Sequence, residues 1–176
     1  NYFNTQLEQN GEMLPTEGYI TDVLTDHALA FMDAHTDEPF FCYLPYNAPH
    51  SPFQVPDKYF NKYKEMELTD KNATVYGMVE NIDDNIARIL SRLEETGKAE
   101  ETLIIFITDN GPNGNRFNGG MLGRKGSVHE GGVRVPSFWY WPGTLNGGRV
   151  VEEITSHIDV FPTLESLLGL NAVETL

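Results

Sequence analysis

Two short segments of the sequence carry side chains that could hold a metal ion and an oxyanion. Asp109 and Asn110 follow the apolar run 105–107, and Lys125 comes a short distance later, flanked by glycines. The carboxylate and amide oxygens of the first pair are hard ligands that suit Ca²⁺ or Mg²⁺. The ammonium group of the lysine can bind a sulfate or phosphate oxygen as a compact charge. This order of residues predicts a metal ion and a fixed positive charge beside one oxyanion.

Each of these residues also has a purely structural interpretation. Asp-Asn-Gly is typical of a turn, and taken alone the tripeptide favours a turn over a metal site. A single lysine is usually a solvated surface residue. Arg134 follows Glu130 by four residues, so we expect the two to pair and hold this loop rather than to act in catalysis.

His50 is the histidine whose setting favours chemistry. Pro49 precedes it and Pro52 follows two residues later. Because proline restricts the backbone, the imidazole would project from a stiff loop, which suits a general acid. The other four histidines have no comparable setting and are expected to be structural. Cys42 lies inside the apolar run 39–44, so it is expected to be an inert core residue rather than a nucleophile.

The hydrophobic pattern alternates between helical spacing and short continuous runs. This alternation predicts an α/β fold, in which ligands bind at the carboxyl ends of strands. The run 102–108 is apolar between its ends, which is typical of a strand covered on both faces in a parallel sheet. The expected helices are 16–31, with Thr16 as N-cap, then 57–64, 71–96 and 159–168, and the expected strands are 39–44, 102–108 and 135–140.

Composition excludes some classes of partner. The chain has 176 residues and a net charge of −14, which opposes binding to nucleic acid or to an anionic membrane surface. No stretch is long and apolar enough to span a bilayer, and one cysteine cannot form an internal disulfide. A local metal ion and a few basic groups could still bind an anionic substrate.

Five segments in a fixed order carry further information together. They are Phe40–Pro52 (FFCYLPYNAPHSP), Asn81–Leu90 (NIDDNI and RIL), Thr102–Gly111 (TLIIFITDNG), Lys125–Pro136 (KGS and EGGVRVP) and Ser156–Leu164 (SHIDVFPTL). In this order they resemble the sulfatase family, of the arylsulfatase type, within the alkaline-phosphatase-like superfamily. The resemblance implies that family's α/β fold, a mostly parallel sheet flanked by helices, and it covers most of the chain.

The resemblance implies a sulfuric ester hydrolase that uses a divalent cation, usually Ca²⁺ with Mg²⁺ as the alternative, and a formylglycine nucleophile. By position, His50 matches the family's histidine beside the leaving-group oxygen, a candidate general acid. Asp109 and Asn110 match metal ligands. Lys125 matches the lysine that contacts the sulfate.

The loop between the metal and lysine positions provides two further candidates. Arg116 and Asn118 are expected to contact the substrate, an expectation that rests on loop position alone. His129 stands where the family often has an aromatic residue, so it is expected to pack there or to reach toward the substrate.

The nucleophile motif of the family, Cys/Ser-x-Pro-x-Arg, is absent. Cys42 is followed by Tyr-Leu-Pro, and no serine begins the motif. We therefore expect residues 1–176 to be the C-terminal part of a sulfatase catalytic domain, without its nucleophile-bearing part and most of its C-terminal subdomain, and inactive alone.

The family implies a small-molecule or carbohydrate sulfate ester as substrate, and a location that is periplasmic, secreted or lysosomal. Two other functions remain open: a phosphomonoester or phosphonate hydrolase of the same superfamily, and a non-catalytic domain that binds metal or a sulfated ligand.

Overall fold

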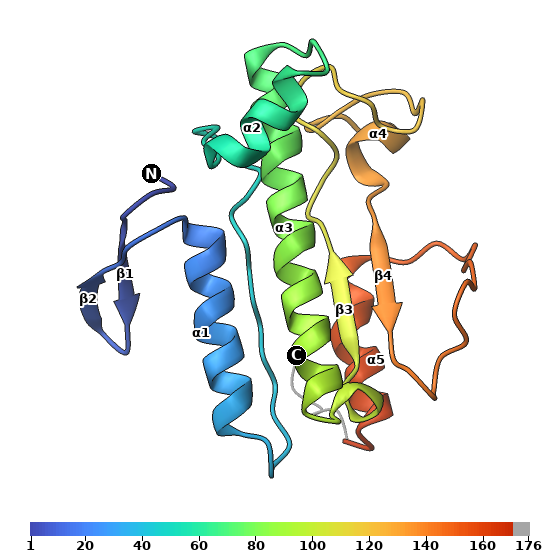
Figure 1. The fold of residues 1–176 in the computed structure, drawn as a ribbon. Helices are drawn as coiled ribbons and strands as arrows, with labels where there is room; N and C mark the ends of the chain where they lie inside the picture. Colours follow the sequence, from blue (N-terminus) through green and yellow to red (C-terminus); the bar gives the residue numbers. More distant parts are fainter. Residues whose placement is uncertain (171–176) are drawn as a thin grey trace. The chain divides into compact units, whose positions relative to one another are not determined.

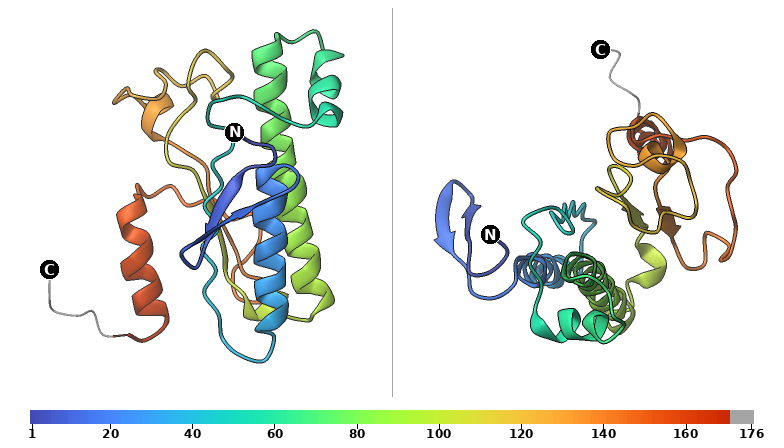
Figure 2. Two further views of the ribbon diagram at one scale, coloured as in Figure 1. Left: turned by 90° about the vertical axis from the view of Figure 1, so that its left-hand side faces the viewer. Right: turned by 90° about the horizontal axis from the view of Figure 1, so that it is seen from above.

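The protein folds as two compact units in the computed structural model, which describes residues 1–170 (Figures 1 and 2). The first unit spans Asn1–Leu145 and the second begins at Asn146. The first contains β1 (Gln6–Gln9), β2 (Glu12–Pro15), α1 (Ile20–Ala34), α2 (Asp57–Lys64), α3 (Asp70–Glu95), the 3₁₀ helix η1 (Ala99–Glu101), β3 (Ile104–Ile107), α4 (Glu130–Val133) and β4 (Ser137–Tyr140). The second contains the 3₁₀ helix η2 (His157–Asp159) and α5 (Val160–Leu167). The predicted α/β class is confirmed.

The long helix α3 is the central element of the first unit. Its N-terminus is capped by Thr69, whose hydroxyl accepts a hydrogen bond from the backbone N–H of Asn72 at 3.3 Å. Its C-terminus is followed by Gly97 in the left-handed region, at a φ of 70°, a common way for helices to end. Both α1 and α2 pack against it (Figure 1). The sequence prediction of a helix over 71–96 is confirmed.

The core of the first unit lies where α2 and α3 meet the N-terminal segment. Its buried members are three tyrosines and three aliphatic or thioether side chains: Tyr2, Tyr19, Tyr59, Ile20, Val55 and Met78. At Gly77 of α3, an added Cβ would lie 3.0 Å from Cβ of Tyr59, so the glycine allows α2 to approach closely. This core anchors the proline-rich segment that carries His50.

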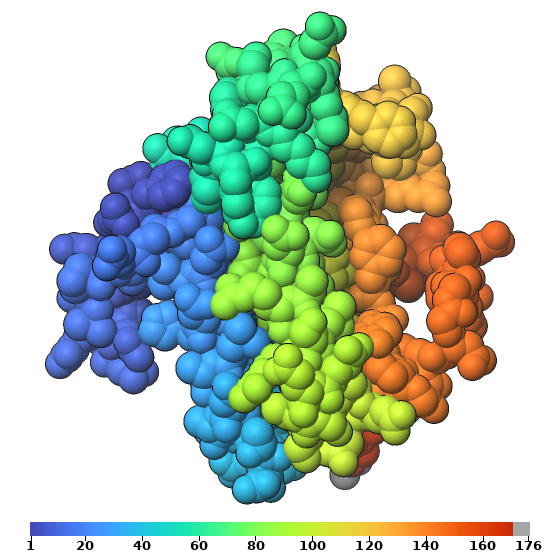
Figure 3. All heavy atoms as spheres, in the orientation of Figure 1, coloured from blue at the N-terminus to red at the C-terminus, as the bar shows by residue number. Residues whose placement is uncertain are grey.

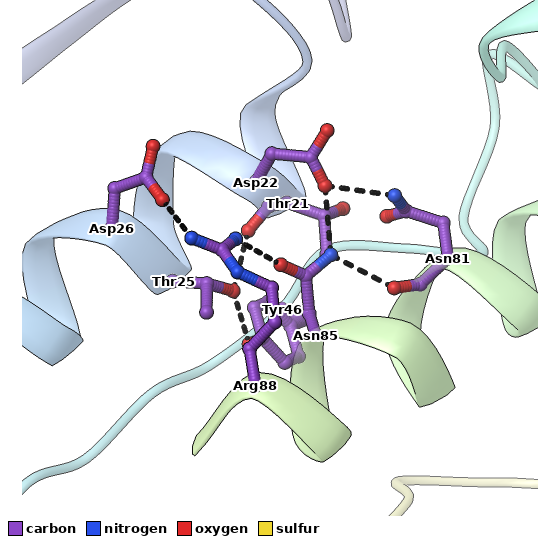
Figure 4. A network of polar contacts seen from close by, with 8 residues as sticks. All are labelled: Thr21, Asp22, Thr25, Asp26, Tyr46, Asn81, Asn85 and Arg88. Atoms are coloured by element: carbon purple, nitrogen blue, oxygen red, sulfur yellow. Dashed lines mark hydrogen bonds and ion pairs between the residues drawn. The ribbon is translucent and has the colours of Figure 1, made fainter. Parts of the chain in front are cut away.

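A polar network joins α1 to α3 (Figure 4). The side-chain amides of Asn81 and Asn85 donate to one oxygen of Asp22 at 2.8 Å and 2.7 Å. Arg88 donates to Asn85 Oδ1 at 2.8 Å and pairs with Asp26. Because Asn81 and Asn85 are fully buried, these bonds fix the alignment of the two helices. The segment 81–90 therefore has a structural role in this fold.

The strands differ from the sequence prediction in three ways. β3 and β4 pair antiparallel, with Ile104 opposite Tyr140, and the described residues contain no parallel pair. β3 is half-buried rather than covered on both faces. The predicted strand 39–44 is an extended segment with no strand partner within residues 1–170, so the prediction was wrong there. An apolar run shows only that a strand is possible, because pairing requires a neighbour.

The prediction that Cys42 is a core residue was also wrong, since its side chain is exposed. It belongs to the same unpaired segment, in which Phe41 and Tyr43 are also exposed. The N-cap of α1 is Tyr19 instead of Thr16, whose hydroxyl donates to the carbonyl of Thr5 at 2.8 Å. The β1–β2 hairpin was not predicted.

In the second unit, a capping box begins the 3₁₀ helix η2, which leads directly into α5. The backbone N–H of Ser156 donates to Asp159 Oδ2 at 2.7 Å, and the serine side chain accepts in return. This local signal explains why the predicted helix 159–168 is present at nearly the expected bounds.

Candidate functional site

The loop that carries His50, residues 45–56, is held by buried tyrosines. Tyr2 Oη lies 2.7 Å from the carbonyl oxygen of His50 and 2.9 Å from that of Asn47. Tyr19 Oη donates to the carbonyl of Gln54 at 2.9 Å. Burial raises the pKa of both phenols, so they stay protonated and remain donors. The core thereby fixes the backbone on each side of the histidine.

The imidazole of His50 is exposed, and its Nδ1 lies 2.9 Å from the carbonyl oxygen of Ser51. A carbonyl only accepts, so Nδ1 carries a proton. Nε2 is therefore the nitrogen that could exchange a proton with a ligand. The peptide bonds before Pro49 and Pro52 are both cis.

Asp109 and Asn110 follow β3 at its carboxyl end, after one intervening residue, as the sequence predicted. The Asp109 side chain is exposed and available to a ligand. The amide nitrogen of Asn110 donates to the carbonyl of Gly111 at 3.1 Å. That bond uses the amide nitrogen, so Oδ1 is the atom that could bind a metal ion.

The loop that carries Lys125, residues 111–129 and here called the lysine loop, closes back onto its own start, just after Asn110. The backbone N–H of Lys125 donates to the carbonyl of Pro112 at 3.1 Å. The N–H of Gly111 donates to the carbonyl of Gly132 at 2.9 Å. The backbone therefore brings together the segments of Asp109, Asn110 and Lys125, which lie apart in sequence. Figure 3 shows this loop at the surface in yellow and light orange.

Glycines allow both the turn at Gly111 and the lysine loop to approach α4 closely. A Cβ at Gly111 would lie 1.9 Å from the carbonyl oxygen of Gly131. A Cβ at Gly131 would lie 2.3 Å from that of Gly123, and one at Gly132 would lie 2.2 Å from that of Ser127. Any side chain at these positions would force the loop open. The EGGV sequence of α4 is thus a packing requirement of the site.

Arg116 connects the lysine loop to the His50 loop. Its guanidinium lies 5.9 Å from the ring centroid of Phe53, three residues after His50, and Lys71 Nζ lies 5.3 Å from the same centroid. Partial burial lowers the pKa of Arg116, because the charged form loses hydration. Phe53 therefore marks the place where the two loops and the start of α3 meet.

A pocket of about 580 Å³ opens beside Arg116. Asn118 also lines it, but its amide nitrogen donates to the carbonyls of Met121 and Gly123 at 2.9 Å and 3.1 Å. Asn118 therefore stabilises the loop, and only its Oδ1 is available to a substrate.

Four polar residues that were not predicted from the sequence also line this pocket: Asn72, Tyr76, Asn115 and Arg124. The neighbouring Lys125 was a possible signal for Arg124. The helical spacing of Asn72 and Tyr76 places them on one face of α3, but nothing in the sequence shows that this face meets the lysine loop.

The remaining residues have structural positions. Arg134 NH1 lies 3.5 Å from Glu130 Oε1, so the predicted pair is confirmed, although both side chains are exposed. The backbone N–H of His129, a residue that is also exposed, donates to Ser127 Oγ at 3.3 Å.

Within residues 1–170, no three His, Cys, Asp or Glu side chains lie together in a way that could hold a metal ion. None of the helices in this part is long and apolar enough to cross a lipid bilayer.

Comparison with known proteins defines the class. The family model named Sulfatase matches residues 1–170. The chain therefore belongs to the sulfatase family, whose members are generally metal-dependent.

Particular relatives support this assignment. The chain is 37% identical over 170 residues to an uncharacterized sulfatase, YdeN, of Escherichia coli (strain K12), covering 92% of this chain and 30% of the relative. It is 36% identical over 166 residues to steryl-sulfatase of Mus musculus, covering 88% and 26%. The crystal structure of Ps i-CgsB in complex with k-i-k-neocarrahexaose has a TM-score of 0.89 at 35% identity, covering 97% of this chain and 38% of that one. The chain thus spans about a third or less of the curated relatives it matches.

Proposed function

We propose that the full-length protein hydrolyses sulfate esters, and that residues 1–176 form one part of its catalytic domain. The observation that carries the proposal is the backbone connection of Lys125 to the turn that bears Asp109 and Asn110. The contact of Arg116 with Phe53 adds the His50 loop to the same region. A metal-ligand pair, a fixed cation and a histidine are the groups that sulfate ester cleavage requires beside its nucleophile.

Each residue has a distinct proposed role. Lys125 contacts a sulfate oxygen and stabilises the charge that develops there. His50 donates a proton from Nε2 to the departing alcohol oxygen, because Nδ1 is engaged with the Ser51 carbonyl. Arg116 and the Oδ1 atom of Asn118 contact the rest of the substrate.

The oxygen atoms of Asp109 and Asn110 fit Ca²⁺, with Mg²⁺ as the alternative, since both ions prefer carboxylate and amide oxygen ligands. The ion would neutralise charge on the sulfate oxygens. Two ligands do not complete a site for either ion, so further oxygen ligands would have to come from residues beyond this set. A formylglycine nucleophile would likewise have to come from residues beyond this set, since its motif does not occur in residues 1–176.

Replacing Lys125 by alanine in the full-length protein tests the proposal. We expect kcat for p-nitrophenyl sulfate to fall by about 10²-fold or more, because a preorganised charge at the reacting group is a large catalytic contribution. Lys98→Ala is the matched control, since it removes a lysine whose partner is the exposed Glu101 on the surface. Activity of Lys125→Ala within about twofold of the unmodified protein would show that this lysine does not contact the sulfate.

Two further assays separate the alternatives. The isolated 176 residues should not hydrolyse p-nitrophenyl sulfate, and measurable turnover would refute the partial-site proposal. Preference of the full-length protein for p-nitrophenyl phosphate would favour a phosphomonoesterase instead. Absence of turnover with both esters, together with retained binding of Ca²⁺, would favour a non-catalytic domain.

We propose a carbohydrate sulfate ester as the natural substrate. The support is the likeness to Ps i-CgsB, whose crystal structure holds k-i-k-neocarrahexaose. The family resemblance also favours a location that is periplasmic, secreted or lysosomal.

A further inference from the structure

The pocket beside Arg116 is rich in basic groups that have no acidic partner. Arg116 and Arg124 line it, and Lys71 Nζ lies over the Phe53 ring that Arg116 also contacts. None of the three forms an ion pair with a carboxylate of residues 1–170. By contrast, six other basic residues of the first unit do: Lys62, Lys64, Arg88, Arg92, Lys98 and Arg134. In a chain with a net charge of −14, unpaired cations in one place indicate a function.

Arg116 is the least satisfied of these groups. Its guanidinium makes no hydrogen bond to any of residues 1–170, and its NH1 atom is buried without a partner. A guanidinium presents five N–H donors, and leaving them unpaired after partial desolvation is unfavourable. The Phe53 ring, whose centroid lies 5.9 Å from the guanidinium carbon, supplies no hydrogen-bond acceptor in the plane of the group. An anionic group with two oxygens would supply the missing acceptors.

The remaining lining fits a ligand of this kind. Arg124 NH1 donates to Asn115 Oδ1 at 3.2 Å, which holds this second guanidinium at the pocket and leaves it other donors. Asn72 and Tyr76 add neutral polar groups from α3. A volume of about 580 Å³ lies within the usual range for a small-molecule site.

We propose that this pocket binds a second anionic group of the substrate, a sulfate or a carboxylate, while Lys125 contacts the sulfate that is removed. The inference rests on the proposed function and narrows it: the substrate carries at least two anionic groups. Sulfated saccharides with a second sulfate or with a uronic acid have this chemistry. Arg116 provides the two-point hydrogen bonding that such a group requires, and Arg124 provides further charge.

Binding of rigid sulfonates to the full-length protein tests this proposal, because sulfonates have no ester to hydrolyse. The probes are benzenesulfonate with one anionic group, then benzene-1,3-disulfonate and naphthalene-2,6-disulfonate with two, at different spacings. A fourth probe, 3-sulfobenzoate, replaces one sulfonate by a carboxylate. We expect at least one two-anion probe to bind about tenfold more tightly than benzenesulfonate in calorimetry. The comparison of 3-sulfobenzoate with benzene-1,3-disulfonate distinguishes the two kinds of second group.

Variants of the two arginines test whether the tighter binding of the two-anion probes arises in the pocket. Arg116→Gln and Arg124→Gln should each reduce the affinity ratio between two-anion and one-anion probes by about fivefold or more. Arg149→Gln, which removes one exposed positive charge from the second unit, should leave the ratio unchanged. The proposal is overturned if no probe with two anions binds more tightly than benzenesulfonate, or if the gain persists in both variants.

Failure of this proposal is distinguishable from failure of the proposed function. Calorimetry measures binding without turnover, whereas hydrolysis of p-nitrophenyl sulfate reports the sulfatase activity. A protein that hydrolyses this ester but shows no second-anion gain is a sulfatase without the proposed pocket.

Discussion

Replacing Gly111 by alanine should open the site without touching any proposed ligand. The added Cβ would lie 1.9 Å from the carbonyl oxygen of Gly131, and Cβ atoms essentially never come within 3.0 Å of another heavy atom in this way. The two backbones must therefore move apart by about 1 Å or more. That movement breaks the hydrogen bond from the Gly111 N–H to the Gly132 carbonyl, which is 2.9 Å long.

The expected cost combines two effects. Overpacking of a tight site costs about 1–3 kcal/mol, and loss of a buried backbone hydrogen bond costs about 1 kcal/mol more. The free energy of unfolding should therefore fall by about 2–4 kcal/mol. The shift moves the Asp109 turn by about 1 Å relative to α4, against which the segment of Gly123 also packs, so kcat should fall by about 10²-fold.

Urea denaturation and p-nitrophenyl sulfate turnover of the full-length protein measure both effects. Gly147→Ala is the control for the substitution itself, since it has open space around it and no left-handed backbone. Gly120→Ala also has open space but a φ of 77°, so it isolates the backbone strain from the clash. The reasoning is refuted if Gly111→Ala matches Gly147→Ala in both stability and turnover.

Tyr2→Phe should lower the free energy of unfolding by about 1–2 kcal/mol and kcat several-fold, because the carbonyl of His50 loses its donor; urea midpoints and turnover measure these changes. Asn85→Ala should cost about 2–3 kcal/mol in urea denaturation, since Asp22 loses a buried donor. Stability should also decline above about pH 10, because burial raises the pKa of Tyr19 and Tyr46. The neutral phenols stabilise the fold below that pH, and the contribution is lost as the pH rises; urea midpoints between pH 8 and 11 follow it.

Each of these predictions has its own contrary result. Tyr43→Phe removes an exposed phenol and should be neutral, so an equal effect of both tyrosine variants would contradict the loop-anchoring role of Tyr2. Asp83→Ala on the exposed face of α3 is the corresponding control for Asn85. A flat stability profile up to pH 11 would show that the buried phenols do not resist ionisation.

Helices could be predicted well because their signals are local. The spacing of apolar residues predicted α3 at nearly its observed bounds, and Gly97 marked its end. The segment 39–44 shows the limit of such signals. Its apolar side chains satisfy the pattern of a buried strand, but a strand forms only where another backbone lies alongside to pair with it.

The candidate site likewise has features that the sequence shows and features that depend on the tertiary structure. The residue types of His50, Asp109 and Lys125 and their order along the chain were visible in the sequence. The contribution of α3 to the pocket, through Tyr76, was not visible, because it depends on which face of a helix meets a loop far away in sequence. The unpaired state of Arg116 is likewise a property of its surroundings.

The sequence by itself determined the α/β class, the principal helices and the kinds of side chain that could do chemistry, because periodicity, capping and residue type act locally. Only the tertiary structure decided that the Asp109 turn and the Lys125 loop lie together. The close approaches at Gly111 and Gly131 make this possible, since two backbones can meet at such distances only where no Cβ separates them.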